Sequence, residues 1–468
     1  RYYLYEVSSK WNPEKGRAQK ITGKFLGTIT EEDGFIESKK QRLLKEVEQL
    51  KNENKNPQIK KLSVKEYGIT KYIDSYLNDY KQLLMKHFPD NWAEIICLTY
   101  GRLTETSALK NMFHHYEHSY LSVLYPKLDL SARSVGELLK NLGYDRERIL
   151  AFIHEFRKAN DCILFDGTDI KSHSKKLMLN QDSKCKDGTF DKALNQMYIF
   201  SVGLQVPIYY RTLPGKVTDV KSFKYSLQES RITDATIITD KGFYSDGNIR
   251  ELDEEKLNYL MPLRRNSHLI DYSIMKSENK KLFEGYFEFE KRFIWYYSIP
   301  AEQGKKVFIF LDQELKTTEE KDYLNRISDQ KENYSIEDFY EVQHKFGTIS
   351  FLTNTNKSGR EIYTDYKNRG AIEQMIDTLK NVLEADKTYM QNEQTLEGWS
   401  FINYLALHWY YKILNLLKEK EVNNKFSPHD FLIKLKEVRK VKINDKWYLA
   451  ETTKKTLDLL TNLGINIT

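Results

Sequence analysis

Two short apolar segments of the chain each end in an aspartate that is followed closely by glycine. Cys162-Ile163-Leu164-Phe165 precedes Asp166, and Thr236-Ile237-Ile238-Thr239 precedes Asp240. Carboxylates at the carboxyl edge of a sheet are held rigidly, and their oxygens are the ligands that Mg²⁺ prefers. One such aspartate by itself is more typical of a turn or a helix cap. Two of them on separate strands, joined by a third acid, predict a two-metal site for phosphoryl transfer.

The segment 366–380 supplies a third acid on a predicted helix. At about 100° per residue, Tyr366, Arg369, Glu373 and Lys380 share an arc of about 60°. A second arc is apolar and is predicted to face a sheet; it comprises Ala371, Ile372, Met375, Leu379, Val382 and Leu383. An amphipathic helix with paired surface charges would have the same pattern. A metal-binding carboxylate flanked by cations that contact phosphate is also what DNA strand cleavage requires.

The spacing of these four residues resembles a known family signature. Tyr366, Arg369, Glu373 and Lys380 reproduce the Y-x2-R-x3-E-x6-K pattern of DDE transposases of bacterial insertion sequences, in the superfamily of insertion sequence family four. The match is specific because four residue types and three spacings agree. The chain is therefore identified as resembling this family.

Three further motifs of the same family occur in the right order. Phe165-Asp166-Gly167-Thr168 resembles the first-aspartate motif, and Asp240-Lys241-Gly242-Phe243 is similar to the second-aspartate motif, D-x-G-(F/Y). Leu213-Pro214-Gly215 with Asp219 resembles the P-G-N-x-x-D loop, although Lys216 stands where asparagine is usual. The four motifs span about 166–380, and no role is assigned to the loop with the departure.

The resemblance implies the chemistry of the three acids. Asp166, Asp240 and Glu373 would be the catalytic residues and would bind two divalent ions, Mg²⁺ or Mn²⁺. Asp169 is a rival for the first acid. Asp166 is preferred because it is predicted to end its strand, whereas Asp169 is predicted to lie in the turn that follows.

The resemblance also implies the partners. Tyr366, Arg369 and Lys380 would contact DNA, with the two cations on phosphates. The substrates would be double-stranded DNA, both the terminal inverted repeats of the element and the target. A homodimer would hold two element ends in a synaptic complex, and the setting would be the cytoplasm of a bacterium, in association with the nucleoid.

The fold class expected from these elements is α/β. After residue 160 the pattern reads strand, strand, strand, helix, strand, helix, strand, which implies a mixed sheet flanked by helices. This order agrees with the ribonuclease-H-like core that the resemblance implies, interrupted by a β-rich insertion. The expected divisions are an N-terminal β unit with a basic helical linker (1–66), a helical DNA-binding region (67–160), the first part of the core (161–264), the β-rich insertion (265–360), the last part of the core with the catalytic helix (361–390) and a helical C-terminal region (391–468).

Two local patterns in the N-terminal part also favour nucleic acid as a partner. Nine basic residues against three acidic ones lie between Lys39 and Lys65, which is typical of a solvated helix or of an arm that contacts phosphates. The capped helix predicted to begin after Ser131, the turn at Gly143 and a second helix at about 145–158 resemble a helix-turn-helix. Short helix pairs are common, so this resemblance is weaker than that of the acid motifs.

Composition excludes several classes. The 468 residues are 40% hydrophobic and 30% charged, with a net charge of +6, as expected of a globular protein. No apolar run approaches the ~20 residues of a membrane helix. Three widely spaced cysteines argue against a disulfide framework and against a cysteine-based zinc site. There is no G-x-x-x-x-G-K-[ST] motif, so ATP dependence is not expected.

The function that the sequence predicts is a DDE-type DNA transposase, which cleaves strands at the ends of an insertion sequence and joins them to target DNA in a cut-and-paste reaction. An alternative is a transposase-derived DNA-binding protein that no longer cuts, although such a protein normally has a broken acid set. Another alternative is an unrelated hydrolase with paired acids, such as a glycosidase. The cations around Glu373 fit a polyanionic substrate better than a sugar.

Overall fold

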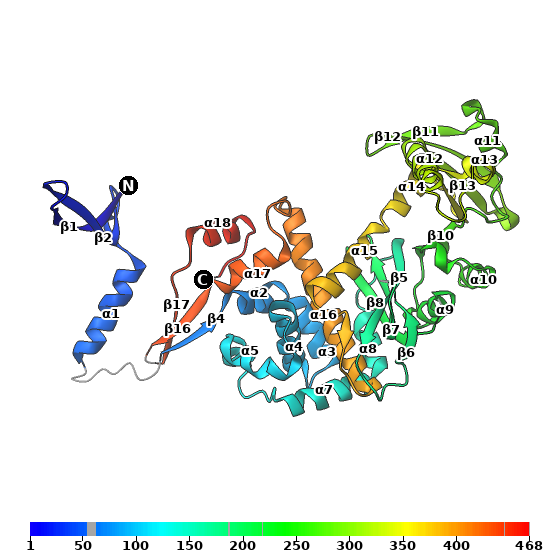
Figure 1. Cartoon of the computed structure of the whole chain (residues 1–468). Coiled ribbons are helices and arrows are strands. Elements are labelled where there is room, and N and C mark those ends of the chain that lie inside the picture. Colours follow the sequence, from blue (N-terminus) through cyan, green and yellow to red (C-terminus); the bar gives the residue numbers. More distant parts are fainter. Residues whose placement is uncertain (54–61, 186–187, 218, 444, 468) are drawn as a thin grey trace. The chain divides into compact units, whose positions relative to one another are not determined.

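The structure is a computed structural model that describes residues 1–53, 62–185, 188–217, 219–443 and 445–467 (Figure 1). Contacts divide the chain into two units. One comprises Arg1–Asn78, His114–Lys127 and Lys420–Thr468, and the other comprises Asp79–Phe113 and Leu128–Glu419. The predicted region 67–160 contributes to both units, and the predicted domain boundaries stay predictions. Part of the predicted basic linker lies outside the described residues.

The centre of the second unit is a mixed sheet. Its core strands are β5 (Asp161–Ser172), β7 (Phe190–Ser201), β8 (Val206–Pro214), β9 (Ala235–Ile238) and β10 (Asn258–Leu263). They lie in the order β8-β7-β5-β9-β10, with β5, β9 and β10 parallel and β7 antiparallel to both of its neighbours. This mixed α/β arrangement is the one expected from the sequence and is consistent with a ribonuclease-H-like core. Two short strands, β6 (Gln181–Lys184) and β15 (Lys387–Thr388), pair with β7 and β5.

The strands of the predicted β-rich insertion continue the same sheet. They are β11 (Gly285–Phe289), β12 (Arg292–Pro300), β13 (Lys306–Asp312) and β14 (Thr348–Thr353). β14 pairs antiparallel with β10, so the hydrogen-bonded ladder runs from the core into the insertion without a break. The helices α11 (Ser273–Ser277), α12 (Gln313–Ser328) and α13 (Ile336–Val342) complete the insertion.

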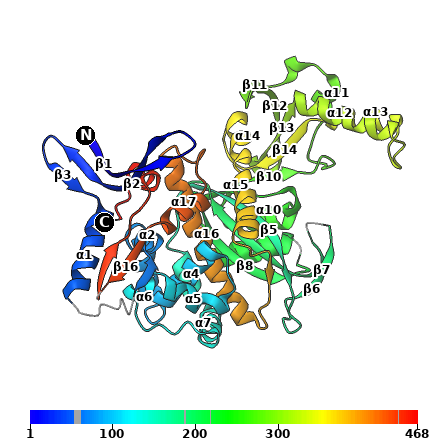
Figure 2. The ribbon, with the colours of Figure 1, turned by 60° about the vertical axis from the view of Figure 1, so that its left-hand side comes forward.

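Helices follow the core strands in the expected places. α9 (Asp219–Ser230) and α10 (Asp246–Glu254) alternate with β9 and β10, and the late helices α14 (Gly359–Lys367) and α15 (Gly370–Asp377) follow β14. α15 lies beside β5 in both views (Figures 1 and 2), and residues of the two elements are in contact. The helix that carries Glu373 is therefore placed over the strand that carries Asp166.

A long buried helix joins the sheet to the helical part of this unit. α16 (Glu393–Glu419) covers the predicted apolar segment Phe401–Leu417 and packs on β8, on α4 (Trp92–Glu105) and on α7 (Ala132–Tyr144). α3 (Asn78–His87) and α8 (Arg146–Ile153) complete the helices of this part. α7 begins after Ser131, whose side chain accepts a hydrogen bond from the Ser134 amide, as the predicted cap requires.

Gly143 is not the turn residue that the helix-turn-helix prediction required. It lies inside α7, and a Cβ atom there would stand 1.8 Å from the Gln394 carbonyl oxygen of α16. Gly398 of α16 faces α7 in the same way, since a Cβ atom at Gly398 would stand 2.1 Å from the Leu139 carbonyl oxygen of α7. The two glycines are needed because the helix backbones approach closely, and this covers one side of α7.

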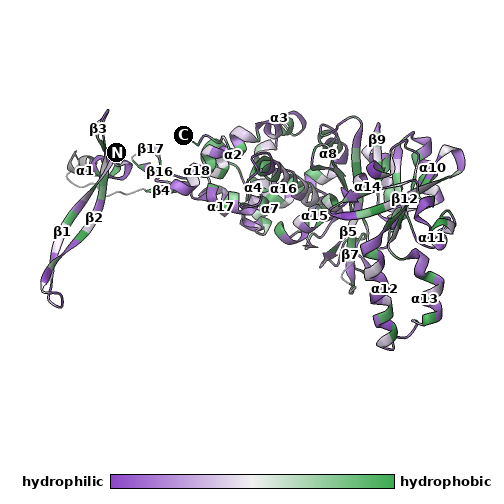
Figure 3. Ribbon diagram, turned by 90° about the horizontal axis from the view of Figure 1, so that it is seen from above, coloured by the Kyte–Doolittle hydropathy of each residue, from purple (hydrophilic) through white to green (hydrophobic). Residues whose placement is uncertain are grey.

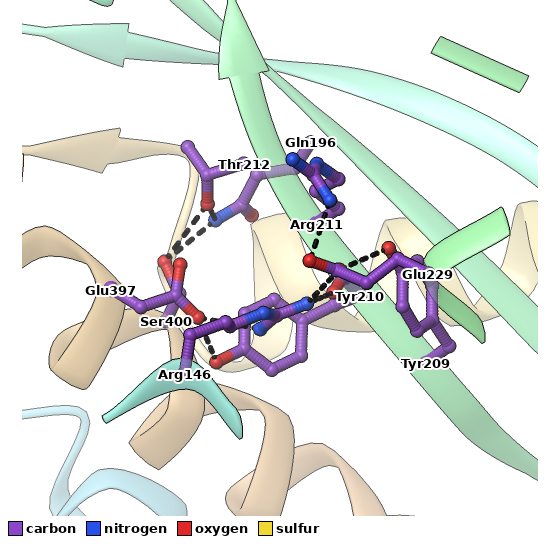
Figure 4. Close-up of polar contacts among 9 residues, drawn as sticks. All are labelled: Arg146, Gln196, Tyr209, Tyr210, Arg211, Thr212, Glu229, Glu397 and Ser400. Atoms are coloured by element: carbon purple, nitrogen blue, oxygen red, sulfur yellow. Dashed lines mark hydrogen bonds and ion pairs between the residues drawn. The ribbon is translucent and has the colours of Figure 1, made fainter. Parts of the chain in front are cut away.

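The N-terminus of α8 is held by a polar network around Arg146 (Figure 4). Its guanidinium lies 2.6 Å from Glu397 of α16 and 2.8 Å from Glu229 of α9, and it donates to the carbonyl oxygen of Tyr210 in β8. Burial lowers the pKa of Arg146, but Glu397, Tyr210 and Glu229 outweigh it and raise that pKa well above its ordinary value. One side chain thus ties α8 to three other elements of the unit.

The first unit contains two small sheets. One is formed by β1 (Tyr2–Asn12), β2 (Arg17–Thr30) and β3 (Gly34–Glu37), and it is followed by α1 (Lys39–Glu53). The other joins β4 (Ser63–Glu66) to β16 (Arg439–Ile443) and β17 (Lys446–Leu449). The other α-helices of this unit are α2 (Gly68–Tyr76), α6 (Leu121–Leu124), α17 (Pro428–Lys436) and α18 (Lys454–Asn462), with α5 (Met112–His118) shared at a boundary. Among the described residues of the whole chain, no helix has the length and apolar character that a membrane crossing requires.

Candidate active site

Asp166 and Asp240 stand at the same level of two neighbouring strands. β5 and β9 pair in parallel, with Ile163 opposite Ile237 and Leu164 opposite Ile238. Each aspartate lies two residues beyond the last of these pairs. The register therefore brings the two predicted acids side by side at one edge of the β5–β9 ladder, as expected for carboxyl ends of parallel strands.

The two strand ends differ from the prediction in one respect. β9 ends at Ile238, and Asp240 then caps a short 3₁₀ turn by accepting from the Lys241 amide at 2.7 Å. β5 does not end at Asp166 but continues to Ser172, because pairing with β7 and β15 extends it. Asp166 is therefore a mid-strand residue, and Asp169 lies in the same strand and not in a turn. The positional reason for preferring Asp166 was wrong, and the choice between the two aspartates stays a prediction.

The late helix is interrupted where the sequence predicted one continuous helix. α14 ends at Lys367, α15 begins at Gly370, and a π-helical turn covers Thr378–Val382. Around Arg369 the amides bond three residues back, with Arg369 N to the Tyr366 oxygen at 2.9 Å. The apolar side is nevertheless as predicted, since four of its residues are buried: Ile372, Met375, Leu379 and Leu383.

The guanidinium of Arg369 lies between two of the predicted acids, Asp240 and Glu373. Its Nη1 atom lies 2.7 Å from Glu373 Oε1, and its Nη2 atom lies 3.7 Å from Asp240 Oδ2. Burial lowers the pKa of Arg369, but Asp240 and Glu373, with a further contribution from Asp166, raise it, and the net shift is upward. Acids from the turn after β9 and from α15 thus meet at one guanidinium, although they are 133 positions apart in the chain.

Tyr366 belongs to the same cluster. Burial raises its pKa, and its hydroxyl interacts with the Arg369 side chain. Among the described residues, the buried Nε of Arg369 has no hydrogen-bond partner. A buried donor of this kind commonly awaits a ligand or a water molecule.

Lys380 is placed differently from the other three residues of its motif. It lies in the π-helical turn, and its Nζ atom is 3.5 Å from Asp169 Oδ2 in β5. The side chains of Lys380 and Asp169 are 22% and 17% exposed, so this ion pair is partly shielded from solvent. The rival first acid is therefore neutralised in this conformation by a predicted DNA-binding residue.

The donor set suits a hard divalent cation, but the acids are not arranged as a metal site here. In the part of the chain that the structure describes, no three histidine, cysteine, aspartate or glutamate side chains are grouped so as to hold an ion. The position between Asp240 and Glu373 holds a positive charge already, that of Arg369. The field of the carboxylates therefore favours a cation at this place, and Arg369 must move if Asp240 and Glu373 are to share an ion.

One residue that positions the site carries no signal in the sequence. Arg102 of α4 donates from Nη2 to the carbonyl oxygen of Leu383, just after the π-helical turn, and from Nε to Asn403 Oδ1 of α16 at 3.0 Å. Burial lowers the pKa of Arg102 to about 10. It fixes the end of the helix that carries Glu373, but these two partners are over 280 residues away in sequence, beyond the range of any periodic pattern.

Comparisons with known proteins identify the family of the chain. No curated protein matches the chain. A solved structure of the piggyBac transposase synaptic complex with hairpin DNA is similar to it at 10% identity, with a TM-score of 0.41, over 74% of this chain and 69% of that chain. The family described as "Transposase DDE domain" matches residues 157–409, which include Asp166, Asp240, Tyr366, Arg369, Glu373 and Lys380. The chain therefore belongs to the family of transposases with a DDE domain.

Proposed function

We propose that this chain is an active DNA transposase of a bacterial insertion sequence, of the family-four superfamily that its Y-x2-R-x3-E-x6-K motif resembles. It would cleave strands at the element ends and join the freed 3′-hydroxyl groups to target DNA. The observation that supports the proposal is that Asp240 and Glu373 flank the Arg369 guanidinium, while the β5–β9 register sets Asp166 level with Asp240. The partners would be the terminal inverted repeats, the target DNA and a second copy of the chain.

Asp166, Asp240 and Glu373 would hold two divalent ions, Mg²⁺ or Mn²⁺, in this role. When bound, the ions would activate water or a 3′-hydroxyl and stabilise the leaving oxygen. Their carboxylate oxygens are the right donors, and the cluster already attracts a positive charge. Asp166 is 7% exposed and the Glu373 side chain is 53% exposed, so the site is buried on the sheet side and exposed on the helix side, where DNA would enter.

The cations of the late helix would bind the phosphates of the strand that is cut. Arg369 presents a planar set of donors, suited to a phosphate group, and its Nε is unpartnered in the described part of the chain. A DNA phosphate that binds the Arg369 guanidinium would draw this guanidinium away from Asp240 and Glu373. Binding of DNA would thus vacate the place that an ion needs, so substrate binding and assembly of the site are coupled in this proposal.

The test is Asp240→Asn. In the variant the activation free energy of metal-dependent cleavage of duplex DNA should rise by several kcal/mol. The cleavage rate should therefore fall by more than about 100-fold, while DNA binding is largely retained. The measurement is cleavage of supercoiled plasmid and of duplexes that carry the DNA flanking the gene, with Mg²⁺ or Mn²⁺. Asp246→Asn is the matched control, because Asp246 is an exposed aspartate six positions further along.

Three outcomes are informative. Undiminished cleavage by the Asp240→Asn variant would remove Asp240 from the site. Wild-type protein that binds DNA but never cuts it would favour the transposase-derived binding protein. Asp166→Asn and Asp169→Asn, measured side by side, decide the first acid: we expect the loss of more than about 100-fold for Asp166 and not for Asp169.

A further inference from the structure

The outer part of the β1–β2 hairpin is a two-stranded ribbon that is open to solvent on both faces. β3 pairs only with the end of β2, from Gly27 to Thr30, so residues 17–25 of β2 pair with β1 alone. Every one of these residues is exposed, as are Tyr2–Trp11 of β1. Figure 3 shows the hairpin as a narrow ribbon with hydrophilic residues towards its turn. A hairpin that buries so little of its surface is only marginally stable by itself, which makes it suited to a partner.

The ribbon is strongly basic. Between residues 2 and 25 there are five basic residues, Lys10, Lys15, Arg17, Lys20 and Lys24, against two acids, Glu6 and Glu14. Within the described part of the chain, none of these five cations is in an ion pair. A dense, unneutralised positive charge on a thin element favours nucleic acid as the partner. It also disfavours a second copy of the ribbon, because like charges would then be brought together.

The strand register sorts the side chains of the ribbon into two faces. Lys10 stands opposite Gln19 and Asn12 opposite Arg17, and residues two apart on a strand share a face. These four residues form one continuous polar face, which we name the Arg17 face. Lys20 belongs to the other face, where it stands opposite Ser9 and next to the pair of Trp11 and Ala18.

The residue types of the Arg17 face are those that read base edges. Arginine and lysine bind the O6 and N7 atoms of guanine, and glutamine binds the N6 and N7 atoms of adenine. Asn12 is already engaged, since its Oδ1 atom accepts from the Glu14 amide at 3.0 Å and its Nδ2 atom donates to Gln19 Oε1. It stiffens the turn, and Lys10, Arg17 and the amide nitrogen of Gln19 remain for DNA.

We propose that this ribbon lies in the major groove of DNA with the Arg17 face towards the bases. The major groove admits a two-stranded β-ribbon, and among the described residues both faces of this one are exposed. Cations on the other face and at the turn, such as Lys20 and Lys15, then contact phosphates on the groove walls. The inference deepens the proposed function, on which it rests: the ribbon selects the DNA sequence, and the acid cluster cuts it.

The experiment uses the full chain and a duplex library with 20 randomised base pairs. Sequences are selected with the wild type and with Arg17→Ala, Gln19→Ala and Lys20→Ala, and affinities for the selected duplex and for a shuffled duplex are measured by fluorescence anisotropy at one salt concentration. Arg17→Ala and Lys20→Ala each remove one charge from the ribbon, on opposite faces, so they are matched. All three positions are exposed, and unchanged thermal unfolding checks the fold.

We expect substitution on the Arg17 face to change sequence preference, and substitution on the other face to change overall affinity only. Arg17→Ala reduces the preference for the selected over the shuffled duplex by about tenfold or more, and one position of the selected sequence becomes degenerate. Lys20→Ala weakens binding to both duplexes by the same factor and leaves the preference as it was. Gln19→Ala relaxes a different, neighbouring position.

Several results would overturn the inference. An unchanged selected sequence for Arg17→Ala would place sequence reading elsewhere in the chain, and equal effects of Arg17→Ala and Lys20→Ala would reduce the ribbon to a non-specific contact. A shift in oligomeric state on ribbon substitution, with DNA preference intact, would make it a contact between copies. Failure of the proposed function is separable, because wild-type protein without cleavage activity can still show the face-specific change in DNA preference.

Discussion

The guanidinium of Arg369 lies 2.7 Å from Glu373 and 3.7 Å from Asp240, and so joins two acids that lie 133 positions apart in the chain. The negative charge of Asp166, the third predicted acid, also contributes to the raised pKa of this guanidinium. An internal cation at this place keeps a cluster of carboxylates stable in the absence of metal, because unpaired like charges repel. It also competes with any ion that uses the same oxygens.

Removal of the Arg369 charge should therefore strengthen the binding of a divalent ion to the DNA-free protein. A hydrogen bond to a charged group contributes about 1.5–3 kcal/mol, so we expect Arg369→Ala to tighten Mn²⁺ binding by about tenfold or more. Titration of Mn²⁺ followed by electron paramagnetic resonance measures this directly, without turnover. Arg369→Lys keeps the charge and should stay close to the wild type; weaker binding by Arg369→Ala would show that no competition exists.

Arg146 holds the two largely buried carboxylates Glu229 and Glu397, which are 19% and 18% exposed. Arg146→Ala leaves Glu397 without its cation, while Glu229 keeps only its pair with Arg211 at 2.6 Å. Breaking a buried pair in this way costs about 3–5 kcal/mol of unfolding free energy. Urea unfolding of the wild type and of the variant gives the difference. The control is Arg133→Ala, which removes an ion pair whose side chains are 87% and 63% exposed and should cost less than about 1 kcal/mol.

The crossing of α7 and α16 depends on the absence of a side chain at Gly143. Gly143→Ala would place a Cβ atom against the Gln394 backbone and should destabilise the fold by about 1–3 kcal/mol, the cost of overpacking. Gly136 lies in the same helix with nothing within 4 Å of its Cβ position. Gly136→Ala should instead stabilise by about 0.5–1 kcal/mol through helix propensity. Thermal unfolding distinguishes the two, and equal effects would contradict the close approach.

His408 makes stability depend on pH. It is buried between the hydroxyls of Tyr80 and Tyr404, and burial lowers its pKa from 6.5 to about 3. The unfolded chain takes up a proton below pH 6.5, whereas the folded chain does so only near pH 3. Stability contributed by the neutral imidazole is therefore lost as the pH falls from 6.5 towards 3, by at most about 1.4 kcal/mol per unit.

His408→Gln removes this titration. The variant is expected to be less stable than the wild type at pH 7, because hydrogen bonds to the tyrosines are altered. The gap should narrow by up to about 2 kcal/mol between pH 6.5 and pH 5. Urea unfolding at several pH values measures it, and parallel pH profiles for the two proteins would argue against a neutral buried His408.

Much of the architecture can be predicted from short stretches of the sequence. The hairpin of β7 and β8, the alternation of β9, α10 and β10, and the burial of Ile372, Met375, Leu379 and Leu383 all follow from apolar periodicity and short turns. The spacing of Arg369 and Glu373, four residues apart on a helix, likewise anticipates their ion pair. Such features depend on neighbours within a few residues, and a linear pattern records those neighbours.

Other features arise only when distant segments meet. β5 extends past Asp166 because β7 and β15 pair with it, and the insertion joins the core sheet because β14 pairs with β10. Gly143 serves a helix crossing and not a turn because α16, some 250 residues later, presses on it. Strand pairing, close packing and the fields of nearby charges are non-local, so the placement of Arg369 between Asp240 and Glu373 was decided by tertiary structure.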